Sequence, residues 1–237
     1  MTTIHHISNA DYLMRGTAYY NKYHKDTLIN RRGAPIPALV AVEFGTVDTI
    51  DADGLCVNVT STGAATLSAT GALVSSSVGT FDVPRCVAVT STANESALTF
   101  TVTGTDEYGE ALVETFAGPN ATISYSQKAF KTVTTITVSG NITSSRVDIG
   151  SSNKIGLPFR GGSGKFIALT VDGVATSTAV TYVSALSSTA VSTATTADVR
   201  GTITLSSAPS GSKYYNALMI VDTSSKTRLF GVDQYGG

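Results

Sequence analysis

The sequence has few charged residues and no tryptophan, and its three histidines all lie within the first 24 positions. Only 14% of the residues are charged. A serine hydrolase of the Ser-His-Asp type needs a histidine, and the chain has none after His24. The remaining route to hydrolysis is a pair of carboxylates, as in glycosidases, but scattered acidic residues are more typical of solvated turns. We therefore expect a protein that is not an enzyme.

Cysteine and long hydrophobic runs are also scarce. The two cysteines, Cys56 and Cys86, each lie within an apolar run, so we expect buried free thiols, with a single disulfide as the alternative. No apolar run approaches the ~20 residues that cross a bilayer. The N-terminus lacks the apolar segment of a signal peptide. We expect a soluble protein made in a host cytoplasm, without a membrane partner.

Hydroxyl side chains are abundant where charges are not. Serine and threonine together supply 63 of the 237 residues, and they alternate with valine through most of the chain. This composition is typical of β-sheets whose outer faces bear hydroxyls. The net charge of -1 gives no general attraction to nucleic acid and little repulsion between copies, so it favours association.

The first 44 residues predict an extended, partly helical arm. Residues 1–32 contain five basic and two acidic residues, a net charge of +3 against -4 for the remainder. Ser8 is a candidate helix cap, and tyrosines follow it at helical spacing until the segment Gly33–Pro37 ends the helix. Since tyrosine and arginine are favoured at interfaces, the arm packs either on its own body or on a neighbouring chain. The predicted partner-binding residues of this arm are Tyr12, Arg15, Tyr19, Tyr20, Tyr23, Arg31 and Arg32.

Residues 45–237 alternate between apolar and hydroxyl side chains in short runs separated by turns. The segments 98–102 and 111–116 flank a turn and predict a hairpin, Thr134-Thr135 interrupts the alternation as a β-bulge would, and Asp172-Gly173 predicts another turn. The predicted fold class is all-β, an antiparallel β-sandwich of jelly-roll type, with a possible subdivision near residues 159–164. Residues 57–77 and 184–197 are of low complexity, and we leave open whether they are strands or loops. The residues expected to face inward are Leu98, Phe100, Val102, Ile167, Leu169, Ile203 and Leu205.

Three short motifs resemble ligand sites but are incomplete. The run Gly161–Lys165 lacks the flanking residues of a phosphate loop, because Phe159 and Phe166 stand at those positions. Asp48, Asp51 and Asp53 resemble the opening of a calcium loop, but Leu55 occupies the next ligand position. His5, His6 and His24 lack the spacing of a zinc site. We expect neither a metal nor a cofactor.

Several phrases, spread in one order over residues 81–160 and 198–235, resemble a family of tailed-bacteriophage virion proteins. They are Phe81–Val89, Leu98–Gly109, Lys128–Ile136, Val147–Arg160, Asp198–Thr202 and Leu229–Tyr235. The resemblance implies a structural protein of the virion, and among such roles we expect a capsid decoration, or cement, protein. Such a protein binds the outside of the major capsid protein lattice and stabilises the head, without an active site.

Two further expectations concern partners. Strand edges with few charged residues are poorly protected against pairing, so we expect a homo-oligomer, with a trimer as first choice and a dimer as second. The alternative function is a head-fibre or tail component that binds a host surface glycan, for which Tyr108 with Asp106 and Glu107 would serve. A secreted adhesin or lectin is a third class, which the missing signal peptide disfavours.

Overall fold

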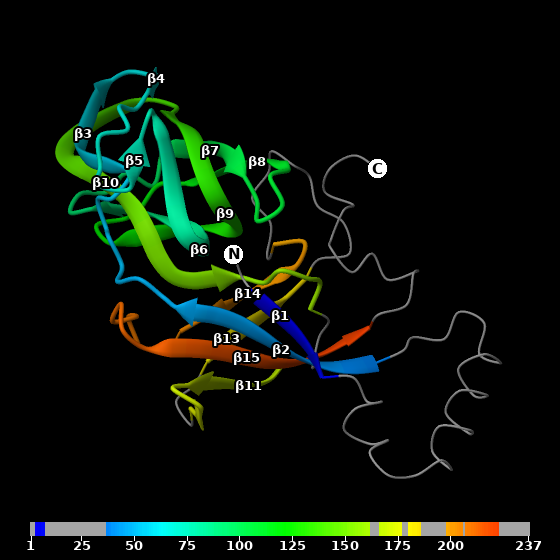
Figure 1. Cartoon of the computed structure of the whole chain (residues 1–237). Coiled ribbons are helices and arrows are strands. Elements are labelled where there is room, and N and C mark those ends of the chain that lie inside the picture. The colour runs from blue at the N-terminus through cyan, green and yellow to red at the C-terminus, as the bar shows by residue number, and fades with distance from the viewer. Residues whose placement is uncertain are drawn as a thin grey trace, which may run out of the picture.

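The structure is a computed structural model that describes residues 3–7, 37–161, 166–176, 180–185, 198–205 and 207–222 (Figure 1). These residues form antiparallel β-strands joined by turns, and no helix occurs among them. The prediction of an all-β chain with antiparallel sheets is therefore confirmed, whereas the helix expected after Ser8 lies outside the described residues. The strands are β1 (Thr3–Ile7), β2 (Pro37–Thr46), β3 (Cys56–Thr62), β4 (Ala65–Thr66), β5 (Val74–Ser75), β6 (Val78–Ser91), β7 (Thr99–Thr105), β8 (Ala111–Ala117), β9 (Ile123–Val138), β10 (Asn141–Gly156), β11 (Phe166–Val171), β12 (Val174–Ala175), β13 (Thr181–Ser184), β14 (Gly201–Thr204) and β15 (Tyr214–Asp222).

The strands belong to two sheets. The smaller has the order β1-β2-β15-β11-β12, and the larger follows the path β13-β14-β10-β6-β9-β7-β8, with β3 on β10, β4 on β9 and β5 on β6. Threonine and valine favour these strands because side chains branched at Cβ fit a pleated surface. Threonine hydroxyls pair across neighbouring strands, with 2.7 Å between the Oγ1 atoms of Thr101 and Thr115 and also between those of Thr105 and Thr132.

The first core lies within the curled half of the larger sheet, which is the cyan and green lobe in Figure 1. We call residues 55–149 the first lobe. Its apolar side chains come from six strands that face one another, so the sheet covers its own core. The buried residues include Phe81 and Val89 from β6, Phe100 and Val102 from β7, Leu112 from β8, Phe130 and Ile136 from β9 and Ile149 from β10.

The second core lies between the smaller sheet and the end of the larger one. We call residues 37–47 and the described residues between 155 and 220 the second lobe. From the smaller sheet it takes alternate residues of β2 and β15, and from the other side it takes Ile155, Leu157 and Ile203. The first lobe is thus inserted in the chain between β2 and the end of β10. Strand β10 connects them, because Ile149 belongs to the first core and Ile155 to the second.

The hairpin and the bulge follow the sequence prediction. Strands β7 and β8 pair in register from Thr99↔Ala117 to Thr105↔Ala111. Thr103 pairs with Thr135 and Gly104 with Val133, which leaves Thr134 as the extra residue of a bulge in β9. The Asp172-Gly173 turn is also present, with both residues at positive φ.

Three expectations need correction. Ile167 is 49% exposed, because a register shift between Phe166 and Ala168 reverses the alternation and turns Ile167 outward. The body does not begin at residue 45, since β2 starts at Pro37 and its alternate residues Val40, Val42 and Phe44 are core residues. The possible division near 159–164 does not separate the two cores, because Phe159 and Leu169, on either side of it, both lie in the second core. The other residues expected inside are buried, apart from Leu98, which is partly buried.

Candidate functional site

The predicted partner-binding residues of the arm lie outside the described part of the chain. This holds for all seven of them, Tyr12, Arg15, Tyr19, Tyr20, Tyr23, Arg31 and Arg32. His24 and residues 162–165 of the incomplete phosphate loop also lie outside it. The site that the structure does describe is the place where the two lobes meet.

The turn between β7 and β8 contains the residues considered for a glycan site. The carboxylate of Asp106 in this turn points into the protein. Asp106 is buried, and its Oδ1 accepts the N–H of Tyr108 at 2.8 Å and the N–H of Glu110 at 2.9 Å. Its Oδ2 accepts a hydrogen bond from Nη2 of Arg200. The Tyr108 ring lies 5.3 Å from Cζ of Arg200, and its hydroxyl donates to the carbonyl of Pro158. The turn therefore binds the second lobe, and Asp106 is not exposed to a sugar.

The three strands β6, β9 and β10 all lose their regular pairing at the boundary between the lobes. The register shifts occur in β6 between Thr80 and Arg85, in β9 between Tyr125 and Ala129, and in β10 between Ser151 and Ile155. A bulge bends a strand and frees backbone groups from the ladder, and buried backbone groups need other partners. Buried polar side chains supply these partners. We call Arg85, Asp106, Glu114, Lys128, Asp198 and Arg200 the junction residues.

The side chain of Glu114 supplies the hydrogen-bond acceptors that a neighbouring strand would otherwise offer to the bulge of β9. Its two carboxylate oxygens accept the N–H groups of Gln127 and Lys128, each at 2.7 Å. The Nζ of Lys128 donates to the carbonyl of Val113 at 3.1 Å. Burial raises the pKa of Glu114 to about 7, although these amide donors and the charge of Lys128 oppose the shift. Burial lowers the pKa of Lys128.

Asp198 and Arg200 extend the junction from the second lobe. Asp198 is buried, and its Oδ2 accepts the N–H of Ala129 at 3.1 Å while its Oδ1 accepts the N–H of Arg200 at 2.9 Å. Burial raises the pKa of Asp198, against the opposing charge of Arg200. Through Asp106 and Arg200 this segment is bonded to the turn between β7 and β8.

Arg85 fills the bend of β6. Its guanidinium donates to both carboxylate oxygens of Asp82, at 2.7 and 2.8 Å, and to the carbonyls of Asp48 and Ser152. Burial would raise the pKa of Asp82, but the hydrogen bonds and charge of Arg85 outweigh it and lower this pKa. A bidentate ion pair of this kind fixes the geometry of both groups. The bend is therefore defined by side chains of its own strand.

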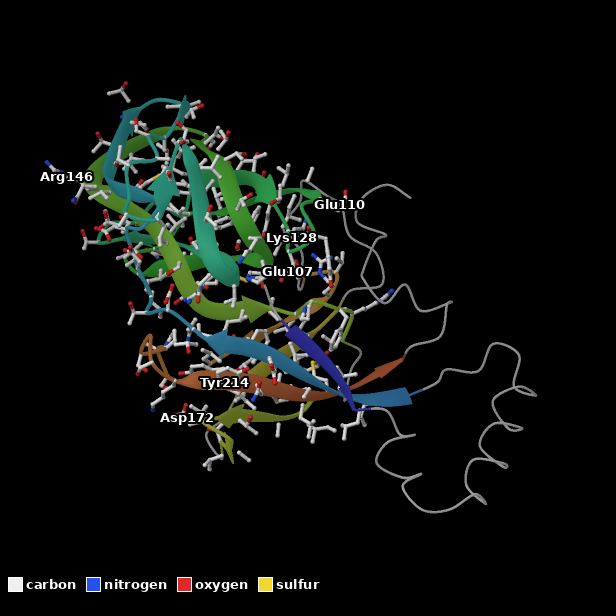
Figure 2. All side chains as sticks on the ribbon, in the orientation of Figure 1. Glu107, Glu110, Lys128, Arg146, Asp172 and Tyr214 are labelled. Carbon is white, nitrogen blue, oxygen red and sulfur yellow. The ribbon has the colours of Figure 1, made fainter. Side chains whose placement is uncertain are left out.

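The burial of the junction residues fits a structural role. Glu114 and Lys128 are 0% exposed, Asp198 is 1% exposed and Arg200 is 2% exposed, so a solute does not reach their charged groups. Figure 2 shows Lys128 where the first lobe meets the second, with Arg146 at the opposite end of the first lobe. The geometry fits hydrogen-bond acceptors and donors that pair with the free backbone groups of the bent strands.

The cysteines agree with the sequence prediction. Cys56 and Cys86 are both free and buried. Burial raises the pKa of Cys56 to about 12 and also raises the pKa of Cys86. Neither thiol is poised for nucleophilic chemistry at neutral pH.

No family model, curated protein or solved structure matches the chain. Among the described residues, no group of three or more His, Cys, Asp or Glu side chains has the arrangement of a metal site. That part of the chain also has no helix long and apolar enough to cross a membrane.

Sequence reasoning missed the junction residues, although two of them left a signal. In the strand 111–117 the residues Leu112, Glu114 and Phe116 occupy alternate positions and all three are buried. Lys128 likewise shares its face with buried Phe130. A charged residue at the apolar positions of an alternating strand indicates a buried, partnered charge. Arg85 and Arg200 left no such pattern, because their partners are distant in the chain or lie within irregular backbone.

Proposed function

We propose that the protein is a structural component of a bacteriophage virion, and within that class a decoration protein on the outer surface of the capsid. It binds the major capsid protein lattice, associates with copies of itself and stabilises the head. The sequence phrases that resemble tailed-phage virion proteins support this proposal. The finer architecture of a jelly-roll-like sandwich belongs to the same proposal.

The structural observation that carries the proposal is the junction between the lobes. A decoration protein holds neighbouring capsid subunits against internal pressure, so its own parts must not move apart under load. Here strand β10 passes from one core to the other, and Asp106 and Asp198 are bonded across the boundary to Arg200 and Ala129. Since such bonds are short range and directional, they oppose both sliding and rotation of the lobes.

The arm supplies the contact with the capsid in this proposal. The net charge of +3 over residues 1–32 complements the net charge of -4 of the remaining chain or an acidic patch on a neighbouring subunit. Each contact of this kind is modest, and several contacts per oligomer add through avidity. Self-association, as a trimer or as a dimer, would provide that multiplicity.

The copy number in purified particles tests this function. We expect copies in the hundreds, in a fixed ratio to the major capsid protein, measured by quantitative mass spectrometry of purified virions. A complement of about twelve or fewer, the number that a single vertex of the particle accommodates, would place the protein in the tail or portal instead. Binding of the purified protein to empty shells provides the second measurement.

A further inference from the structure

A cleft of about 380 Å³ opens at one corner of the second lobe, between the smaller sheet and the segment that follows β14. Its floor is apolar and includes the buried residues Leu169, Leu205 and Tyr215. Its rim is polar and includes Asp172, Ser207 and Lys213. The cleft therefore borders three residues of the second core.

The hairpin of β11 and β12 forms one side of this cleft. Val171 pairs with Tyr215 on one side and with Val174 on the other, so all three side chains share the face that is directed toward the core. Tyr215 is 3% exposed, whereas Val174 is 71% exposed. The opposing sheet thus covers the centre of the smaller sheet and does not extend over its last strand.

Of the features that normally prevent strands from pairing, this edge has one, the short length of β12, which has two residues. β12 is the last strand of the smaller sheet, and no described strand pairs with its outer edge. Strands β11 and β12 contain neither a charged residue nor a proline, which are two further protections of an edge. Two further exposed apolar side chains, Ile167 and Tyr214, lie on β11 and β15. Figure 2 shows Tyr214 beside Asp172 at the tip of the hairpin, and they are hydrogen-bonded.

The backbone at this edge is oriented for a further strand. The N–H of Thr176 donates to the carbonyl of Leu169, so these two residues form a hydrogen-bonded pair. In an antiparallel ladder such pairs alternate with pairs that are not bonded, and Thr170 with Ala175 is the next pair. The N–H and C=O of Ala175 therefore point away from β11, toward the open edge.

We infer that the β11–β12 edge pairs with the same edge of a second copy about a two-fold axis. An antiparallel two-fold contact joins the two smaller sheets, satisfies the backbone groups of Ala175 and brings the two clefts together. Each Val174 then covers the apolar floor of the neighbouring cleft. The rim residues Asp172 and Lys213 have opposite charges, so they complement one another across the axis. This inference rests on the self-association in the proposed function, and it selects the dimer over the trimer.

Sedimentation velocity at micromolar concentration tests the edge, with three variants of the full chain. Val174→Asp places a carboxylate over the neighbouring apolar floor, and Ala175→Pro removes the outward N–H without affecting the bonds of the hairpin. The matched control is Val57→Asp, which alters an exposed valine on β3 of the first lobe, 37% exposed. We expect a dimeric wild type, dissociation constants raised at least ~10-fold by Val174→Asp and by Ala175→Pro, and no change from Val57→Asp.

A monomeric or trimeric wild type, a dimer insensitive to Val174→Asp, or equal weakening by Val57→Asp would overturn the inference. Circular dichroism establishes that each variant is folded, and Val174→Asp alone suffices if Ala175→Pro does not fold. Binding to empty shells separates this inference from the proposed function. A monomeric protein that binds shells contradicts the edge contact and the self-association but not the decoration role, and a dimer that fails to bind them contradicts only the decoration role.

Discussion

At the scale of single residues, the protein buries several charged side chains although its charged residues are few. Only 14% of the residues are charged, yet Arg85, Glu114, Lys128 and Asp198 are all buried. Burying a charge is costly unless it is paired and hydrogen-bonded, and each of these groups has backbone partners. The charged side chains therefore form hydrogen bonds with backbone groups where the strands bend, while threonine hydroxyls cover the regular strands.

Replacing Glu114 by glutamine should change how stability depends on pH. The pKa of Glu114 is about 7 in the folded protein and 4.5 in the ordinary case, so the folded state binds the additional proton between these values. The titration of Glu114 therefore lowers the free energy of unfolding by roughly 1–3 kcal/mol as pH rises from about 4.5 to about 7. Urea denaturation across this range should show that decline in the wild type and a smaller decline in Glu114→Gln. Parallel profiles for the two proteins would contradict the raised pKa.

Replacing Phe100 by alanine should cost about 3–5 kcal/mol, because the lost burial leaves a cavity in the first core. Phe100 is 0% exposed and lies among the strands of the first lobe. Ile123→Ala is the control, since Ile123 is 42% exposed and its truncation should cost no more than about 0.5 kcal/mol. Chemical denaturation measures both, and a loss below about 1 kcal/mol for Phe100→Ala would show that the assigned register is wrong.

At the scale of elements, bulges decide where strands bend and which side chains face inward. Beside the bulge at Thr134, Gly104 lies so close to β9 that an added Cβ would be 1.9 Å from the carbonyl oxygen of Thr132. No side chain fits at this point, and backbone cannot move aside as a flexible side chain does. The close approach of β7 and β9 there depends on glycine.

Gly104→Ala should therefore destabilise the first lobe by several kcal/mol, about 3 or more. Gly63→Ala is the matched control, because nothing lies within 4 Å of a Cβ at that position. It should change stability by less than about 1 kcal/mol. Thermal unfolding of the two variants measures this difference, and equal midpoints would show that the strands separate there without cost.

Asp106→Asn should weaken the contact between the lobes by about 3–5 kcal/mol, since it leaves the buried guanidinium of Arg200 without its carboxylate. Glu110→Gln, an exposed change in the same turn, is the control. Unfolding followed by circular dichroism should remain one cooperative transition in the control and shift markedly in Asp106→Asn. A shift of the same size in both variants would show that the ion pair contributes nothing specific.

The fold was largely predictable from local pattern, while the junction was not. Alternation over residues 98–116 predicted β7 and β8 correctly, and the break at Thr134 predicted a bulge. The same reasoning failed at Ile167, because the bulge in β11 has no turn residue or break in composition to indicate it. Arg200 could not be paired with Asp106 from sequence, since 94 residues separate them and only the completed fold brings them together.

At the scale of the whole molecule, the proposed role assigns the capsid contact to the arm. A variant with Tyr12, Tyr19 and Tyr23 replaced by serine removes the tyrosine stripe and retains strand β1. We expect it to fold with unchanged circular dichroism and to lose binding to empty shells by at least ~10-fold, because buried tyrosines are frequent interface hot spots. A second variant with Ile123→Ser controls for the loss of an exposed apolar side chain on the body. Undiminished binding of the triple variant would move the capsid contact to the β body.

The insertion of the first lobe into the second has a consequence for synthesis. The strands of the first lobe lie between residues 56 and 149, apart from the end of β10, so their pairing can begin as soon as that stretch leaves the ribosome. The second core must wait, because β2 pairs with β15 and Tyr214 pairs with Thr46. Contacts this distant in sequence form slowly, and domains generally fold in the order of their synthesis. During translation β2 therefore stays an apolar strand without its β15 partner, next to a lobe whose strands have already been synthesised.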